Sequence, residues 1–172
     1  MFRSLNADEI EARVGVCSEK GVSLLLYKDA RCDMRVLDET FGTFGWRNSY
    51  ETINGELFCT VEVWDAEKNQ WIAKQSNGSP SNVEQEKGRA SDALKRACTM
   101  LGIGRELYNA PFIWIPADKC NIGRNKQGKP TCYDRFRVQK VLIEDGRIKA
   151  VAIVNDNTRK VCYVWQEGND GA

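Results

Sequence analysis

The sequence predicts an α+β fold in which an antiparallel β-meander packs on a long helix, followed by a three-stranded antiparallel extension. An Asn-Gly pair at 54–55 and an Asp-Gly pair at 145–146 separate strand-like runs, which predicts hairpins because both turn residues need positive φ. Between these two regions, apolar residues recur at three- and four-residue steps and stop at Gly102 and Gly104, which predicts the long helix.

Length and charge limit what this chain can be. Its 172 residues suit one domain, or one domain with an extension, and can bury a core without disulfides or metals. The net charge is +1, so a nucleic-acid surface would have to concentrate positive charge locally or repeat it by assembly. We find no bilayer-spanning apolar run and no signal peptide, and we expect a cytoplasmic protein with no membrane partner.

The absence of histidine excludes Ser-His-Asp and Cys-His catalysis, and it excludes His-containing zinc sites. The seven cysteines include no C-x-x-C pair, and we interpret them as free thiols in a reducing compartment. The sequence also has no phosphate-binding loop of the form G-x-x-x-x-G-K-S/T. We therefore expect a non-enzymatic protein with no catalytic residue, metal or cofactor.

The N-terminal elements are predicted from caps and apolar runs. Asn6 and Glu9 match a capping box, which predicts a short helix ending near Gly15. The apolar run at 21–28 predicts a buried strand.

A helix and a meander follow. Residues 29–42 predict a helix that ends at Gly42, with an apolar stripe formed by Met34, Leu37 and Phe41. Alternating and apolar runs then predict three strands, at 46–53, 57–65 and 71–76.

The long helix is predicted over about 82–101, where Ser81 and Glu84 match a second capping box. Its predicted apolar stripe comprises Val83, Ala90, Leu94, Ala97 and Leu101.

The C-terminal section is expected to be β-structure. A Pro-punctuated extended segment at 109–120 leads into a polar loop at 121–131, which we expect to be mobile. Three antiparallel strands follow, at 134–144, 147–155 and 160–166. We expect residues 1–110 to form the core and residues 111–172 to form a β extension of the same domain.

Basic residues gather on the polar side of the long helix. On a helical wheel Arg89 and Arg96 share that side with Asp92, and Lys95 lies beyond the opposite flank of the apolar stripe. A solvated polar face is the plain alternative, with the Arg89–Asp92 pair worth a few tenths of a kcal/mol.

Two quoted segments carry a resemblance to a known family. The segments "KGRASDALKRACTMLGIGRELY" and "YKDARCDMRVLDETFGTFGW" resemble motifs of the Rad-fifty-two family of single-strand annealing proteins and its phage Sak relatives. The first is similar to a helix that ends in A-x-S/T-D-A/G-L-K-R-A, and the second to a strand and helix that close in F-G-x-x-G-W. The resemblance covers residues 5 to 110. It implies oligomeric rings that hold single-stranded DNA in a basic groove and anneal complementary strands without ATP in recombination and repair.

The resemblance also implies site residues. It places Lys95 and Arg96 in the groove. A family arginine maps to Cys32, so that Arg31 and Arg35 are the neighbouring candidates. A further basic position is Thr99 here, and Arg105 is a candidate to replace it. The predicted DNA-binding set is Lys95, Arg96, Arg31, Arg35, Arg89 and Arg105.

Other functions stay open at this point. A meander followed by a basic helix is also typical of double-stranded-RNA-binding domains. A carboxylate- or metal-dependent nuclease would need an acidic cluster, but the spacing of Glu39, Glu51, Glu62 and Asp65 does not favour one. The expected partners are single-stranded DNA, further copies of the chain in a ring or helical assembly, and a single-strand-binding protein or recombinase. We expect the tryptophans to pack in the core or between subunits.

Overall fold

The computed structural model describes residues 2–79 and 85–168 and confirms an α+β protein with antiparallel sheets. The chain folds as two compact units. Residues 1–3 and 28–105 form the first, here called the meander unit, and residues 4–27 and 106–172 form the second, here called the curled-sheet unit. This division differs from the one expected after residue 110, because the N-terminal strands pair with the C-terminal ones.

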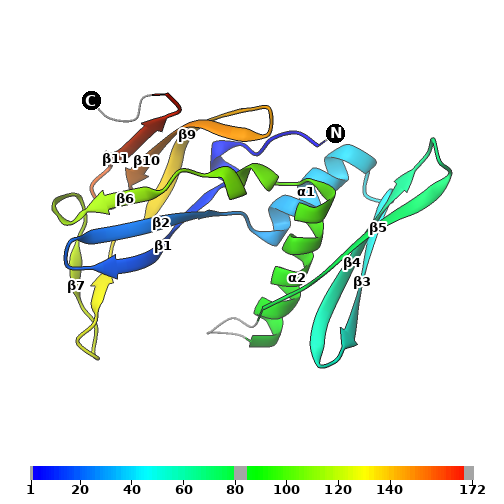
Figure 1. Cartoon of the computed structure of the whole chain (residues 1–172), viewed down its shortest axis with the longest axis horizontal. Coiled ribbons are helices and arrows are strands. Elements are labelled where there is room, and N and C mark those ends of the chain that lie inside the picture. The colour runs from blue at the N-terminus through cyan, green and yellow to red at the C-terminus, as the bar shows by residue number, and fades with distance from the viewer. Residues whose placement is uncertain (1, 80–84, 169–172) are drawn as a thin grey trace. The chain divides into compact units, whose positions relative to one another are not determined.

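The meander unit contains both α-helices and one sheet. Its elements in chain order are α1 (Ala30–Phe41), β3 (Trp46–Ile53), β4 (Glu56–Asp65), β5 (Gln70–Asn77) and α2 (Gln85–Leu101). The three strands pair antiparallel in the order β3-β4-β5, and α2 packs on β4 and β5 (Figure 1). Strand β3 is exposed along almost its whole length.

Local signals explain where α1 begins and ends. The Asp29 carboxylate accepts a hydrogen bond of 2.7 Å from the Cys32 amide, and the helix ends at Gly42, where φ is 73°. The predicted stripe was partly wrong, since Met34 is exposed. The buried face of α1 consists of Cys32, Asp33, Val36 and Leu37.

The predicted turn between β3 and β4 is present, with positive φ at both Asn54 and Gly55. Helix α2 ends before Gly102, as predicted. Its predicted capping box and Val83 lie outside the described residues. Of the rest of the predicted stripe, Leu94 and Ala97 are buried, together with Ala93 and Cys98.

The curled-sheet unit is built around a six-stranded sheet in the order β11-β10-β9-β1-β2-β6. Its strands are β1 (Glu11–Ser18), β2 (Gly21–Tyr27), β6 (Ile113–Pro116), β9 (Phe136–Glu144), β10 (Arg147–Asn155) and β11 (Lys160–Gln166). The edge strands β6 and β11 contact each other, and the Tyr163 hydroxyl donates a 3.1 Å hydrogen bond to the Phe112 carbonyl. The sheet therefore curls toward closure around an apolar interior.

Two predictions about this unit were wrong. The expected N-terminal helix is a single 3-10 turn, η1 (Ala7–Glu9), followed directly by β1. The Glu9 carboxylate does accept a 2.9 Å hydrogen bond from the Asn6 amide, but the next residues gain more by pairing with β2 and β9. The expected mobile loop at 121–131 contains a hairpin of β7 (Ile122–Arg124) and β8 (Pro130–Cys132).

Short 3-10 segments complete the fold: η2 (Arg105–Asn109) and η3 (Ala117–Lys119). Within the described ranges, no helix has the length and apolar character needed to cross a membrane.

Candidate nucleic-acid interface

Asp92 holds together the two adjacent basic residues of α2. Its carboxylate lies 2.8 Å from Arg96 Nε and 4.0 Å from Lys95 Nζ. The same carboxylate accepts a 2.9 Å hydrogen bond from the Ser79 amide. We call Ser79, Asp92, Lys95 and Arg96 the Asp92 cluster.

The end of β5 approaches α2 closely enough to build this cluster. A Cβ on Gly78 would lie 2.0 Å from the Arg89 carbonyl oxygen and 2.8 Å from the Ala93 nitrogen. Only glycine fits between these atoms without moving the backbone. The close approach brings the Ser79 amide to Asp92, so the cluster depends on Gly78 as well as on its charged members.

A buried ion pair supports α2 beneath Lys95. The Lys28 ammonium pairs with the Asp33 carboxylate, and these side chains are only 5% and 0% exposed. Lys28 Nζ also donates to the Lys95 carbonyl over 3.4 Å, and that carbonyl accepts a 2.9 Å hydrogen bond from the Thr99 hydroxyl. The backbone of α2 at Lys95 is thus fixed by two side-chain donors.

The ion pair with Lys28 satisfies only one carboxylate oxygen of Asp33. Its second oxygen, Oδ2, is buried and has no hydrogen-bond partner among the described residues. Burial raises the pKa of Asp33 to about 6, although the positive charges of Lys28 and Lys95 act to lower it. Sequence reasoning missed both Lys28 and Asp33. The pair is buried only because α2 packs over it, and no local spacing in the sequence indicates that packing.

The α1 candidates do not share a helix face with the buried Asp33. Arg31 and Arg35 are exposed and lie on the face of α1 opposite Asp33. Cys32, where the resemblance implies an arginine, is buried at 3% exposure and cannot replace that arginine at a surface.

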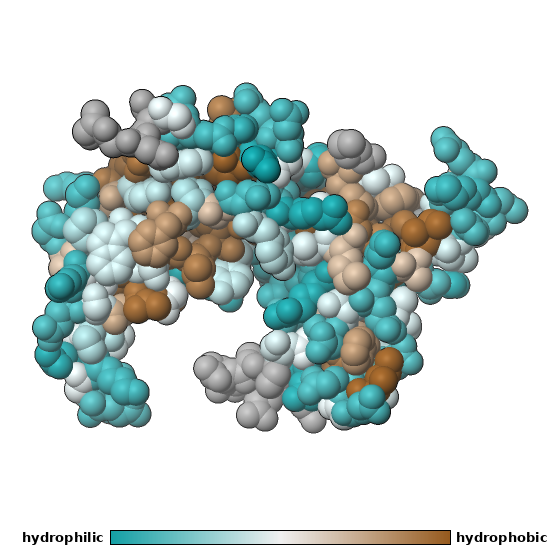
Figure 2. Space-filling model, in the orientation of Figure 1, coloured by the Kyte–Doolittle hydropathy of each residue, from teal (hydrophilic) through white to brown (hydrophobic). Residues whose placement is uncertain are grey.

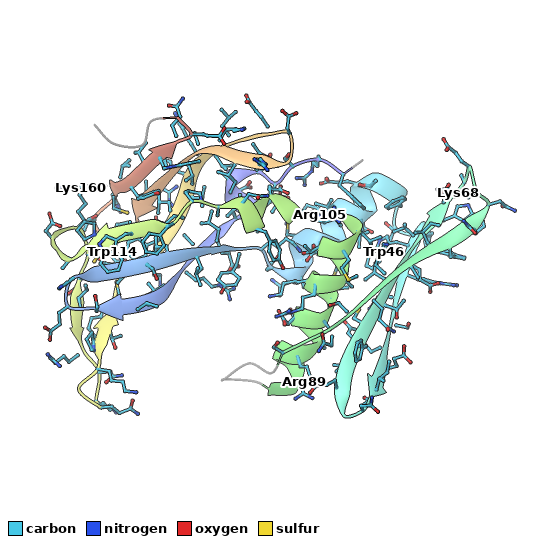
Figure 3. All side chains as sticks on the ribbon, viewed as in Figure 1. Trp46, Lys68, Arg89, Arg105, Trp114 and Lys160 are labelled. Carbon is cyan, nitrogen blue, oxygen red and sulfur yellow. The ribbon has the colours of Figure 1, made fainter. Side chains whose placement is uncertain are left out.

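The last two candidates lie near the ends of α2 (Figure 3). Arg89 is half-buried, and its Nε has no hydrogen-bond partner in the residues that the structure describes. Arg105 is exposed, and its guanidinium donates to the carbonyl oxygens of Thr99 (3.2 Å) and Met100 (2.9 Å). Arg105 therefore caps the C-terminal end of α2, where a cation is favourable.

The four carboxylates considered for a nuclease site each have a structural partner in the meander unit. Glu62 pairs with Arg47 and Asp65 pairs with Lys68. Glu39 pairs with Arg3, and Glu51 accepts from Gln75. Across the described ranges, no group of three or more cysteine, aspartate or glutamate side chains is placed to hold a metal ion.

The outer face of the meander carries an aromatic pair of tryptophans, for which we expected packing in the core or between subunits. Trp64 and Trp71 pack edge to face with centroids 5.5 Å apart, and the Arg47 guanidinium lies 4.2 Å over the Trp71 ring. Trp64 is 37% exposed, which excludes a core position within this unit.

Comparison of the chain with protein-family models, with curated proteins and with solved structures found no match in any of the three.

Proposed function

We propose that this chain binds single-stranded DNA without sequence preference and anneals complementary strands, without ATP and as a homo-oligomeric ring or helical assembly. The observation that carries the proposal is the Asp92 cluster, in which two adjacent cations project from a helix whose backbone is held by Lys28. A fixed cation at a fixed position suits phosphate contacts, which supply affinity but carry no base information.

Charge arithmetic supports a repeated rather than a single site. Asp92 neutralises one of the two cations, so each cluster offers one net positive charge. A single phosphate contact gives weak binding, but an assembly that repeats it forms a continuous track with strong salt dependence. Both Lys95 and Arg96 remain accessible, with 24% and 47% of their side chains exposed. Recombination and repair, with a single-strand-binding protein or recombinase as partner, is the setting that we propose.

The test is a charge-matched pair of double variants. Lys95→Ala with Arg96→Ala removes two cations from the cluster, and Lys68→Ala with Lys74→Ala removes two from the β4–β5 hairpin. We expect only the first to lower affinity for single-stranded DNA, to reduce the dependence on salt and to slow annealing. Equal effects of the two pairs would contradict the proposed site, and preferential binding of duplex RNA by the wild type would contradict the proposed function.

A further inference from the structure

The curled-sheet unit carries aromatic side chains on its outer surface. Strand register places Trp114 opposite Ser23, and Arg13 opposite Leu25. Because side chains alternate along a strand, one face of β1, β2 and β6 presents Arg13, Leu25, Tyr27, Phe112 and Trp114. We call these five residues the aromatic face. The opposite face points into the sheet interior, where Val22, Leu24 and Ile113 are buried.

The side chains of the aromatic face are open to solvent. Phe112 is 78% exposed, Leu25 48% and Tyr27 39%. Figure 2 shows pale and brown side chains gathered over β2 and β6, where Figure 3 labels Trp114. The Phe112 and Trp114 rings are nearly parallel, with an interplanar angle of 14° and centroids 6.5 Å apart.

Charged side chains lie at both ends of this face, but only one end carries cations without an ion-pair partner among the described residues. The Arg13 guanidinium lies 5.4 Å over the Tyr27 ring, at the end of the face where β2 finishes, and it pairs there with the Glu11 carboxylate, which lies opposite Tyr27. At the other end, Lys20 accepts a 3.0 Å backbone hydrogen bond from Ala117, which brings η3 and its Lys119 to the turn before β2. Lys20 and Lys119 are exposed and form no ion pair within the described residues.

We propose that the aromatic face stacks unpaired bases of single-stranded DNA, as a second contact for the strand that the proposed function brings to the protein. Aromatic rings with exposed cations at one end match a strand's alternation of flat bases and phosphates, and base–aromatic stacking tolerates any sequence. Lysine is depleted in protein–protein interfaces, so Lys20 and Lys119 beside the rings favour a polyanion over a protein partner. Strand β2 extends about 20 Å, enough for two or three bases.

The inference rests on single-stranded DNA being the ligand, and the experiment separates it from the Asp92 cluster. Affinity is measured for an oligothymidylate and for an abasic oligomer of the same length, which keeps the phosphates and lacks bases. The variants are Phe112→Leu, which keeps an apolar side chain but loses the ring, and Phe112→Tyr, which keeps the ring. Leu25→Ala is matched by Leu142→Ala on β9, where Leu142 is 47% exposed.

We expect Phe112→Leu to weaken oligothymidylate binding about 5- to 100-fold, the effect of losing one stacked base, and to leave abasic binding unchanged. Phe112→Tyr should bind as wild type does, and Leu142→Ala should have no effect. The Lys95→Ala and Arg96→Ala double variant should weaken binding of both oligomers and keep their ratio. If the ratio of oligothymidylate affinity to abasic affinity falls only in Phe112→Leu, the result supports the aromatic face. It does so even if the Lys95→Ala and Arg96→Ala double variant binds both oligomers as wild type does.

The inference is overturned if wild type binds the two oligomers equally, or if Phe112→Leu leaves their ratio unchanged. It is also overturned if Phe112→Leu changes the oligomeric state in mass photometry at an unchanged ratio, because a second copy of the chain then covers the face.

Discussion

The side-chain ammonium of Lys28 donates a hydrogen bond to the backbone carbonyl of Lys95, although the two residues are 67 positions apart in the chain. Lys28 follows the last residue of β2, and Lys95 lies in the second half of α2. The contact connects the beginning of the meander unit to the part of α2 that carries the proposed DNA contacts.

Removing Lys28 should destabilise the meander unit. In Lys28→Met the buried Asp33 loses its counter-charge, and we expect a loss of about 3–5 kcal/mol in the free energy of unfolding. Chemical denaturation measures this loss, with Lys68→Met as the exposed control. Adding Asp33→Leu to Lys28→Met should restore most of the stability, because no buried charge then remains. A Lys28→Met protein as stable as wild type would show that the pair is not buried.

Stability should depend on pH through Asp33. Its pKa is raised from 3.8 in the unfolded chain to about 6, so the native state holds an extra proton between these values. The contribution of this group to stability therefore rises as pH falls from 7 through 6, and it levels off below 4. Between pH 7 and pH 5 we expect wild type to gain about 1 kcal/mol relative to Asp33→Asn. Parallel stability curves for the two proteins would contradict the burial of Asp33.

Replacing Asp92 separates charge from geometry in the proposed site. Asp92→Ala increases the net charge by one, but it releases Arg96 and the Ser79 amide. We expect weaker binding to single-stranded DNA, because a freely rotating Arg96 loses more side-chain entropy on binding a phosphate. Fluorescence anisotropy at two salt concentrations checks this. Tighter binding would show that Asp92 only neutralises its neighbours.

Gly78→Ala should loosen the end of β5 from α2. The added methyl group meets backbone atoms of Arg89 and Ala93, which cannot rotate away as a side chain can. We expect a cost of roughly 1–3 kcal/mol in stability, as for other overpacked positions. Ser79→Ala is the matched control, since its hydroxyl accepts only a long 3.4 Å bond from Arg96. Equal melting temperatures for the two variants would contradict the close packing of Gly78.

Truncation after Ala110 should leave the curled-sheet unit unable to fold. Strands β6, β9, β10 and β11 all lie beyond that residue, so the β1–β2 hairpin would be left with its apolar face uncovered. We expect aggregation, seen as insoluble protein on expression. A soluble fragment whose β1 and β2 amides are protected from hydrogen exchange would mean that residues 4–27 do not need the C-terminal strands.

Local signals in the sequence were enough to predict most elements, and long-range pairing explains the failures. The turn at Asn54–Gly55 and the end of α1 at Gly42 depend on neighbouring residues, and both were predicted correctly. The segment after Asn6 carries a real helix-start signal, but it becomes β1 because Ala12 pairs with Leu26 and Phe136. No spacing rule reveals partners so far away in the chain.

The proposed site shows the same limit. Lys95 and Arg96 stood out as neighbours on one helix, but their orientation depends on Asp92 and on Ser79 from another element. The aromatic face was hidden for a similar reason. Phe112 and Trp114 meet Leu25 and Tyr27 only through the pairing of β2 with β6.

Residues 28–105 of the meander unit are an insertion within the chain of the curled-sheet unit, which supplies residues 4–27 before them and residues from 106 onward after them. During synthesis on the ribosome, residues 28–105 emerge complete while β1 and β2 still await their partners. Both ends of the insertion reach the last turns of α2, through Lys28 at the Lys95 carbonyl and Arg105 at the Thr99 carbonyl. Once residues 28–105 have folded, they no longer form a flexible loop between Tyr27 and Glu106. The six-stranded sheet can then form without a loop-closure cost of about 4 kcal/mol. A mutation that slows folding of the insertion would therefore also delay formation of the six-stranded sheet, although it changes no residue of that sheet.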